Sequence, residues 1–386
     1  MKIIFRTFIS CIFLFSMFPG KAQEVDPYSA DPNPAREIPG MSLVWSDEFN
    51  TDGKPDPKNW KFEKGFVRNE ELQWYQSDNA NCRDGLLVID GKQEQVVNPN
   101  YLEGSTDWKR NRQYANYTSS SIISQGLQQF QYGRFEIRAR IDTTMGSWPA
   151  IWTKGITGKW PFCGEIDIME FYRDYVGSVR KKPILLANVA WGHATYSWGA
   201  WDTQKVALTH FTSKDTDWCE KFHVWRMDWT KDSINLYLDD ELLNTTLVEK
   251  TKNPEGYAPQ EPHRQKHFIL LNLAIGANGG NPVASDYPIK YEVDYVRVYQ
   301  PTPTAVKELN DQVVKIYPNP ASEVIHIDTD IPVQKIQLFN ISGCQMLNID
   351  EPATTLDIST LKKGIYMLKI YFEDGKCQSE RIVLIN

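Results

Sequence analysis

Hydrophobic and polar positions alternate in short runs through most of the chain, with the two-residue period of a β-strand. The run at 134–141 has an apolar residue at every second position and a charged residue at each position between. The runs at 223–229 and 234–239 alternate in a similar way, and Asp239-Asp240 is typical of a hairpin turn. Helical periodicity is scarce. The pattern therefore predicts an all-β fold, either a sandwich or a barrel.

The alternation breaks near the C-terminal end. Residues 301–312 begin Pro-Thr-Pro-Thr and have the composition of a linker. Short strand-like runs resume within residues 313–386, a length that suffices for a minimal β-sandwich. We therefore expect a large β domain at 41–300 and a second, small C-terminal β-sandwich domain.

The N-terminal end has the features of an export signal. Lys2 and Arg6 precede an apolar stretch, and Gly20-Lys-Ala22 offers small residues for cleavage. We expect residues 1–22 to be a signal peptide. Residues 23–40 are rich in Pro, Asp and Ala and would form an extended leader.

Three acids interrupt one of the most apolar runs of the chain. Glu165 and Asp167 are two residues apart, so a strand points both to one face. Glu170 would point to the opposite face, unless a β-bulge at Ile168–Met169 turns it back. Burying an acid costs on the order of several kcal/mol, so a row of three acids predicts a chemical role.

Two carboxyl groups about 5–5.5 Å apart are the pair used by a retaining glycoside hydrolase. One attacks the anomeric carbon, while the other protonates the leaving oxygen and then activates water. A third acid can share a proton and keep the pKa values of the outer two apart. The alternatives are an acidic strand edge or half of a calcium site. Calcium loops, however, are rich in Gly, Asn and Asp rather than in apolar residues.

The cysteines set a limit on cross-linking. Loss of Cys11 with the signal peptide leaves five cysteines, so at least one thiol of an exported chain is free unless it bridges chains. Cys344 and Cys377 share the C-terminal segment and could pair. Cys163 lies two residues before Glu165, but no His is close in sequence to activate it, and a catalytic role is disfavoured.

The acidic run resembles the active-site strand of glycoside hydrolase family 16, whose signature is Glu-x-Asp-x-x-Glu. Other segments resemble the family in the same order: Trp45-Ser-Asp-Glu-Phe49, Asn69-Glu-Glu-Leu-Gln-Trp-Tyr75, Tyr117-Thr-Ser119, Tyr132-Gly-Arg-Phe-Glu136, Gly146-Ser-Trp-Pro-Ala-Ile-Trp152, Trp160-Pro161, Leu271-Asn-Leu-Ala-Ile-Gly276 and Val293-Asp-Tyr-Val-Arg-Val-Tyr299. The resemblance covers roughly residues 41–300. It implies a concanavalin A-like β-jelly-roll sandwich with a glycan cleft across its concave sheet, and retaining endo-hydrolysis of β-linked polysaccharides.

The C-terminal segment resembles a second family. Tyr317-Pro-Asn-Pro320, Phe339-Asn-Ile-Ser-Gly343 and Leu361-Lys-Lys-Gly-Ile-Tyr366 are similar to the C-terminal sorting domain of the type IX secretion system. The resemblance implies export to the periplasm and then secretion or attachment at the cell surface. A carbohydrate-binding module is the alternative, but the segment contains no Trp to stack on a sugar.

The resemblance assigns roles to the residues of the site. Glu165 would be the nucleophile, Glu170 the acid/base and Asp167 their electrostatic partner. Residues that would contact the substrate come from loops rich in aromatic and amide side chains: Asn69, Glu71, Trp148, Trp152 and Trp160. A core role is the alternative for Trp152, and a turn-forming Asn with a solvated Glu is the alternative for Asn69 and Glu71.

Few other partners are expected. The net charge of −7 offers no electrostatic footprint for nucleic acid. The partners implied are a β-linked polysaccharide and the type IX secretion machinery, with the enzyme itself a monomer. Catalysis would need no cofactor. Glu48, Gly85 and Asp294 match positions at which family members hold a structural calcium ion.

These features predict a secreted, laminarinase-like endo-β-glucanase that cuts β-1,3 or mixed β-1,3-1,4 linkages. One alternative keeps the mechanism and changes the polymer to an algal galactan such as agarose, porphyran or carrageenan; Arg68 and the cluster at 109–112 leave it open. A catalytically silent glycan-binding protein is the third reading, against which the intact acids argue. Relatives carry a His after the catalytic strand, yet His193 does not align safely, and 194–221 is long.

Overall fold

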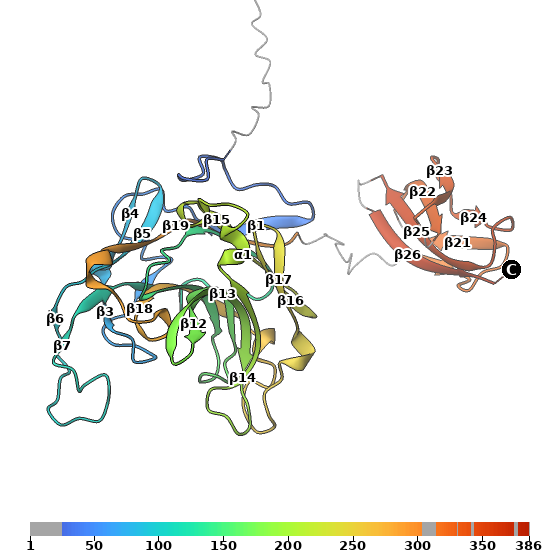
Figure 1. The fold of residues 1–386 in the computed structure, drawn as a ribbon. Coiled ribbons are helices and arrows are strands. Elements are labelled where there is room, and N and C mark those ends of the chain that lie inside the picture. Colours follow the sequence, from blue (N-terminus) through green and yellow to red (C-terminus); the bar gives the residue numbers. More distant parts are fainter. Residues whose placement is uncertain (1–24, 303–313, 330, 341–342, 374–376, 386) are drawn as a thin grey trace, which may run out of the picture. The chain divides into compact units, whose positions relative to one another are not determined.

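The computed structural model describes residues 25–302, 314–329, 331–340, 343–373 and 377–385. The signal peptide predicted at 1–22 and almost all of the expected linker lie outside the described residues. The chain divides into two compact units, residues 1–302 and 303–386. Both are built from strands, so the predicted all-β class is confirmed (Figure 1).

One layer of the larger unit is an eight-stranded antiparallel sheet in the order β17-β16-β15-β10-β19-β5-β4, with β1 also paired to β19. The alternation at 134–141 corresponds to β10, whose apolar side chains face the interior. The strands of this sheet are β1 (Met41–Asp47), β4 (Ala80–Arg83), β5 (Leu86–Gly91), β10 (Gly133–Arg140), β15 (His223–Trp229), β16 (Ser233–Leu238), β17 (Glu241–Leu247) and β19 (Ile289–Pro301).

The other layer is a seven-stranded antiparallel sheet in the order β14-β13-β12-β11-β18-β9-β2. Its central strand β12 contains the acidic run. The strands of this sheet are β2 (Lys61–Phe62), β9 (Ser121–Ile123), β11 (Ser147–Gly155), β12 (Glu165–Val176), β13 (Val179–Trp191), β14 (Ala200–Ala207) and β18 (His267–Ile275).

Short elements connect the two sheets. Among the described residues, no helix is long and apolar enough to cross a membrane. The short strands form two pairs, parallel β3 (Gln73–Tyr75) with β8 (Tyr117–Ser119) and antiparallel β6 (Val96–Val97) with β7 (Tyr114–Ala115). The helical turns are α1 (Thr209–Thr212), η1 (Ser77–Asn79), η2 (Trp218–Glu220), η3 (Val248–Lys250), η4 (Pro262–Arg264), η5 (Ala277–Gly279) and η6 (Ala284–Asp286).

A hydrophobic core fills the space between the two sheets. Strand β12 contributes Ile166 and Phe171, and β15 contributes Trp225 and Met227, all of them fully or almost fully buried. These residues alternate along each strand with residues of the opposite face. Because β12 gives its apolar side chains to the core, its other face is left for the acids.

The expected leader lies against the eight-stranded sheet. The Arg138 guanidinium of β10 donates to the carbonyl oxygens of Ser29 and Asp26, at 2.7 and 2.8 Å. The backbone N–H of Phe222 donates to the Pro27 carbonyl at 2.7 Å. The leader therefore follows the surface of the larger unit.

The smaller unit holds a three-stranded sheet, β20-β21-β24, and a four-stranded sheet, β23-β22-β25-β26. A core that includes Ile325, Leu338 and Leu368 lies within this unit. Cys344 and Cys377 are both free, so the pairing considered from the sequence is not present in the structure. The strands are β20 (Lys315–Tyr317), β21 (Val324–Asp328), β22 (Val333–Asn340), β23 (Gln345–Ile349), β24 (Thr355–Asp357), β25 (Gly364–Phe372) and β26 (Cys377–Leu384).

Candidate active site

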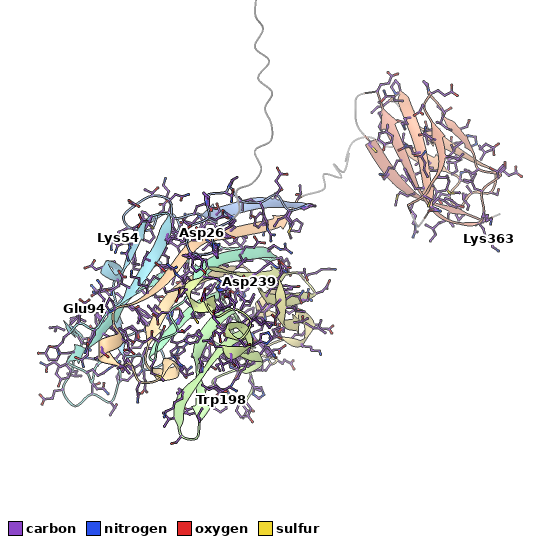
Figure 2. The ribbon with its side chains drawn as sticks, turned by 45° about the horizontal axis from the view of Figure 1, so that its top comes forward. Asp26, Lys54, Glu94, Trp198, Asp239 and Lys363 are labelled. Carbon is purple, nitrogen blue, oxygen red and sulfur yellow. The ribbon has the colours of Figure 1, made fainter. Side chains whose placement is uncertain are left out.

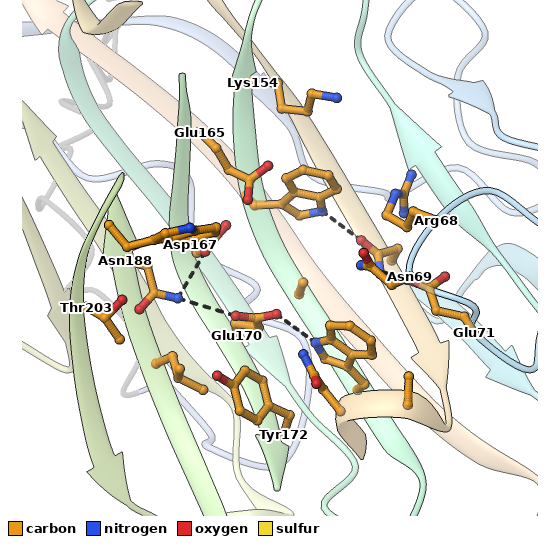
Figure 3. A pocket seen from close by; sticks show the side chains of 18 of the residues that line it. Arg68, Asn69, Glu71, Lys154, Glu165, Asp167, Glu170, Tyr172, Asn188 and Thr203 are labelled. Carbon is orange, nitrogen blue, oxygen red and sulfur yellow. Dashed lines mark hydrogen bonds between the residues drawn. The ribbon is translucent and has the colours of Figure 1, made fainter. Parts of the chain in front are cut away.

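A cleft of about 730 Å³ lies over the seven-stranded sheet, with β12 at its centre (Figure 3). It brings together all the residues that the sequence assigned to catalysis and substrate contact: Asn69, Glu71, Trp148, Trp152, Trp160, Glu165, Asp167 and Glu170. Segments about a hundred residues apart in sequence thus meet in one surface. Their roles stay predictions.

The β-bulge expected in β12 is confirmed. Asp167 pairs with Trp152 of β11, whereas Glu170 pairs with Ala150, and the register shifts between the two pairs. A matching shift occurs against β13 between Asp167 and Glu170. The extra residue turns Glu170 to the face that carries Glu165 and Asp167. All three carboxyl groups therefore line the cleft.

Two neighbouring side chains orient the acids. The Trp148 indole N–H donates to Glu170 Oε1 at 2.8 Å. The Asn188 amide of β13 donates to Asp167 Oδ2 at 3.0 Å and reaches Glu170 Oε2 at 3.3 Å. Asn188 thus bridges Asp167 and Glu170 across the bulge, as Figure 3 shows. Both donors lie on strands, β11 and β13, and they hold the carboxyl groups of Asp167 and Glu170 in position.

Burial raises the pKa of all three acids, and the Asp167 charge adds to the rise for Glu165 and Glu170. Burial raises the pKa of Asp167 to about 7, although the Asn188 hydrogen bond opposes the shift. Burial and the Asp167 charge raise the pKa of Glu170 to about 8. Burial, with the Asp167 charge second, raises the pKa of Glu165 well above its ordinary value. Near neutral pH the row therefore carries fewer than three negative charges, which suits proton transfer.

Two cations act on Glu165 without forming an ion pair with it. Lys154 of β11 is its partner in strand register, and the Lys154 charge is the largest influence that lowers the Glu165 pKa. Arg68 lowers the Glu165 pKa less. Arg68 itself is bound to Glu63 and lies over the Trp152 ring, 5.1 Å from the ring centroid. Lys154 is therefore the main electrostatic counterweight at this end of the row.

The side chains expected to contact sugar differ in exposure. Glu71 is only 2% exposed, accepts a 2.7 Å hydrogen bond from Gln73, and has its pKa raised to about 7 by burial. Glu71 is therefore not the solvated side chain of the alternative reading. Trp152 is 8% exposed and its indole N–H donates to Asn272 at 2.7 Å. Trp160 is 40% exposed at the edge of the cleft.

The sequence did not single out several residues that line the cleft. Asn188 was the polar residue within an apolar run, which was a usable signal. Trp201, Thr203 and Lys205 occupy alternate positions of β14 and all line the cleft. Their alternation was also visible, although nothing in the sequence located β14 beside β13.

Cys163 has no catalytic features in the structure. It is 1% exposed, and burial raises the pKa of its thiol above the ordinary value. A neutral buried thiol is a poor nucleophile. This agrees with the interpretation that disfavoured a catalytic thiol.

The positions expected to hold calcium lie with the eight-stranded sheet, not in the cleft. Asp294 Oδ2 accepts from the Arg138 guanidinium at 2.6 Å and from the Asp31 N–H at 3.1 Å. The Glu48 carboxylate is paired with Arg297. Within the described part of the chain, no group of three or more His, Cys, Asp or Glu side chains could hold a metal ion. The carboxylates of Glu48 and Asp294 are therefore occupied by arginine partners. The calcium site itself stays a prediction.

Comparisons with known proteins bear on this site. The model for glycosyl hydrolases family 16 matches residues 84–296, and that for the secretion system C-terminal sorting domain matches residues 315–385. A β-glucanase of Rhodothermus marinus is 34% identical over 282 residues, spanning 68% of this chain and 87% of the relative.

Solved structures agree in fold. A laminarinase from Rhodothermus marinus aligns with a TM-score of 0.53 at 31% identity, covering 68% of this chain and 99% of that one. A structure from work on endo-acting O-glycanases, with which members of the human gut microbiota initiate mucin breakdown, aligns with a TM-score of 0.61 at 33% identity. That alignment covers 70% of this chain and 95% of the other.

Proposed function

Since this chain belongs to family 16 of the glycosyl hydrolases, we propose that it is a retaining endo-β-glucanase that hydrolyses internal β-1,3 or mixed β-1,3-1,4 linkages. The observation that carries the proposal is the bulge in β12, which gathers Glu165, Asp167 and Glu170 on one face of the cleft. The similarity to a β-glucanase and to a laminarinase supports a glucan as the polymer.

The first step needs an ionised Glu165 and a protonated Glu170. The Glu165 carboxylate attacks the anomeric carbon as the glycosidic C–O bond breaks, and Glu170 gives its proton to the leaving oxygen. Burial and the Asp167 charge raise the pKa of Glu170, which favours a group able to donate a proton at neutral pH. Lys154 and Arg68 oppose the rise in the Glu165 pKa, which favours the ionised nucleophile.

The second step reverses the roles of Glu170. Its carboxylate takes a proton from water, the resulting hydroxyl attacks the anomeric carbon, and the bond to Glu165 breaks. Two displacements at one carbon retain its configuration. Asp167 lies between the two acids, and its charge raises the pKa of both. We assign it the role of taking up part of the negative charge change as Glu165 and Glu170 exchange states.

A second candidate keeps the mechanism and changes the polymer. Lys154 and Lys205 place two cations in the cleft, as a sulfated or otherwise anionic glycan would require. The similarity to a structure from work on endo-acting O-glycanases adds mucin glycans to the galactans inferred from sequence. Glucan remains the first candidate because Lys205 forms an ion pair with Asp174 at 3.3 Å. This pair leaves less positive charge in the cleft for an anionic substrate.

A product profile tests both candidates. Purified enzyme is incubated with laminarin, barley β-glucan, lichenan, agarose, carrageenan and mucin, and the products are separated by size. We expect internal cleavage of laminarin or mixed-linkage glucan, with the anomeric configuration retained in the first NMR spectra. Cleavage of a galactan or mucin alone would support the second candidate, and an inverted product would contradict the mechanism.

The C-terminal unit determines where the reaction takes place. Residues 315–385 match the secretion system sorting domain, which directs the enzyme to the cell surface or beyond. Polysaccharides too large to enter a cell are therefore within its reach. The partners supported are a polysaccharide and the secretion machinery.

A further inference from the structure

The loop between β13 and β14, residues 192–199, carries a stack of aromatic rings outside the catalytic row. The centroids of His193 and Tyr196 lie 4.5 Å apart at an interplanar angle of 22°, and those of Tyr196 and Trp198 lie 4.8 Å apart at 17°. Tyr196 is 46% and Trp198 59% exposed. Exposed apolar side chains usually occur singly, so a contiguous series of exposed rings indicates a binding surface.

Backbone contacts fix the stack in place. His193 Nδ1 accepts hydrogen bonds from the backbone N–H groups of Thr195 and Tyr196, at 3.1 and 3.2 Å. The Gly199 N–H donates to the Tyr196 carbonyl at 3.1 Å, which forms a turn at the end of the loop. Gly199 has φ +80°, and a side chain there would meet the Trp191 carbonyl at 2.6 Å. The loop is therefore closely packed, and its rings lose little entropy when a ligand binds.

The stack is continuous with the wall of the cleft. Trp201 lines the cleft, and its indole N–H donates to the Trp198 carbonyl at 2.7 Å. Trp160 also lines the cleft, and Gly199 packs near Pro161, the residue that follows it. Trp198 lies at the lower edge of the larger unit in Figure 2. A chain of sugars in the cleft could thus continue from Trp201 onto the stack.

The sheet order gives this path a direction. β14 is the edge strand of the seven-stranded sheet, and Trp201 is aligned through Ala190 of β13 with Glu165 of β12. Asn69 and Glu71 come from the loop on the other side of β12, beyond β11 and β18 (Figure 3). A polymer that enters past Asn69 and crosses the acids therefore leaves over β14.

We propose that Tyr196 and Trp198 form an outlying sugar-binding platform for the part of a β-linked polysaccharide that leaves the cleft past Trp201. The proposal rests on the proposed function, because it takes the occupant to be the same chain that is cut. Tyr196 covers one face of the Trp198 indole. Because Trp198 is 59% exposed, more than half of this side chain remains available to the apolar face of a pyranose ring.

The test compares substrates of different length. Full-length Trp198→Ala and Tyr196→Ala variants are assayed on laminarin and on laminari-oligosaccharides of increasing length. Tyr28→Ala is the matched control, because Tyr28 is 45% exposed but lies on the leader. We expect kcat/KM of the two variants to fall about three- to tenfold on the polymer, the effect of one aromatic contact. The shortest cleaved oligosaccharide should show no change, and Trp198→Phe should recover part of the loss.

Two results would overturn the platform. One is unchanged kcat/KM on every substrate. The other is an equal loss on short and long substrates, which would mean that the loop only supports the cleft wall. The activity of the wild-type enzyme on β-glucan distinguishes failure of the platform from failure of the proposed function. If it cleaves no β-glucan, the proposed function fails, and the same length comparison is made with the polymer that it does cleave.

Discussion

The two sheets of the larger unit both bury carboxylates, but they surround them in different ways. On the eight-stranded sheet, the buried Asp294 is paired with Arg138 at 2.6 Å and the partly buried Glu292 with Arg140 at 2.5 Å. On the seven-stranded sheet, no ion pair among the described residues reaches the three acids of β12. The hydrogen-bond donors to Asp167 and Glu170 are the neutral side chains of Trp148 and Asn188.

The difference separates a structural carboxylate from a reactive one. Burial raises the pKa of Asp294, but the Arg138 hydrogen bond and charge oppose that rise and favour the ionised form, so removing Arg138 leaves an uncompensated charge. Within the described part of the chain, Asp167 and Glu170 form no such ion pair, and burial raises their pKa values to about 7 and about 8, so they can exchange a proton near neutral pH. The fold therefore uses carboxylates for structural ion pairs on the eight-stranded sheet and for chemistry on the seven-stranded sheet.

The largest expected effect is on the seven-stranded sheet. Glu165→Gln and Glu170→Gln should each lower kcat by on the order of 10³-fold or more, because each acid carries a separate step. The melting temperature should hold or rise above neutral pH. The raised folded-state pKa means that ionisation of these acids costs stability as pH rises through it. Near wild-type kcat in either variant would remove that residue from the mechanism.

The next effect is on the eight-stranded sheet, where a substitution should lower stability and leave kcat almost unchanged. Arg138→Met should lower the free energy of unfolding by about 3–5 kcal/mol, because it leaves Asp294 buried and unpaired. The kcat should change little. Chemical denaturation of the residue 1–302 transition measures the loss, and the double variant Arg138→Met/Asp294→Leu should recover part of it. A variant as stable as wild type would show that this ion pair is dispensable.

A smaller effect tests whether the Lys154 charge influences ionisation of Glu165 in the cleft. Glu165 must be ionised to attack, so activity falls as pH drops through its pKa. The Lys154 charge lowers that pKa, and Lys154→Met should therefore move the acidic limb of the kcat/KM profile to higher pH. Lys154→Arg should restore the wild-type position. An unmoved limb in Lys154→Met, with activity lost equally at every pH, would point to a role in sugar contact.

The smallest effect concerns divalent cations. Because Arg138 already neutralises Asp294, chelation with EDTA should leave the melting temperature of the wild-type enzyme unchanged. Readdition of Ca²⁺ to the chelated enzyme should likewise have no effect. A clear drop on chelation that calcium reverses would establish the calcium site predicted at Glu48, Gly85 and Asp294.

The strands and the acidic row could be predicted because both follow from local spacing. A strand has two faces, so the positions of Glu165, Asp167 and Glu170 required either a bulge or a split row, and only the bulge placed Glu170 on the face of Glu165. The alternation at 134–141 located β10 to within one residue for the same reason.

Contacts between strands could not be predicted in the same way. Asn188 meets Asp167 because of the register of β13 on β12, which periodicity does not set. Trp148 was expected to contact the substrate, and this stays a prediction; that its N–H donates to Glu170 follows from the pairing of β11 with β12, which the sequence does not set. Arg138 belongs to the charged positions of an alternating run, yet its carboxylate partner lies 156 residues further along the chain.

The pairing of β1 with β19 has a consequence for biogenesis. Met41 pairs with Pro301, so the first and last strands of the larger unit are adjacent in one sheet. That sheet cannot close until residue 301 has been synthesised, and contacts so distant in sequence form slowly. Pairing of β1 with β19 is therefore one of the last steps that we expect in the folding of this unit.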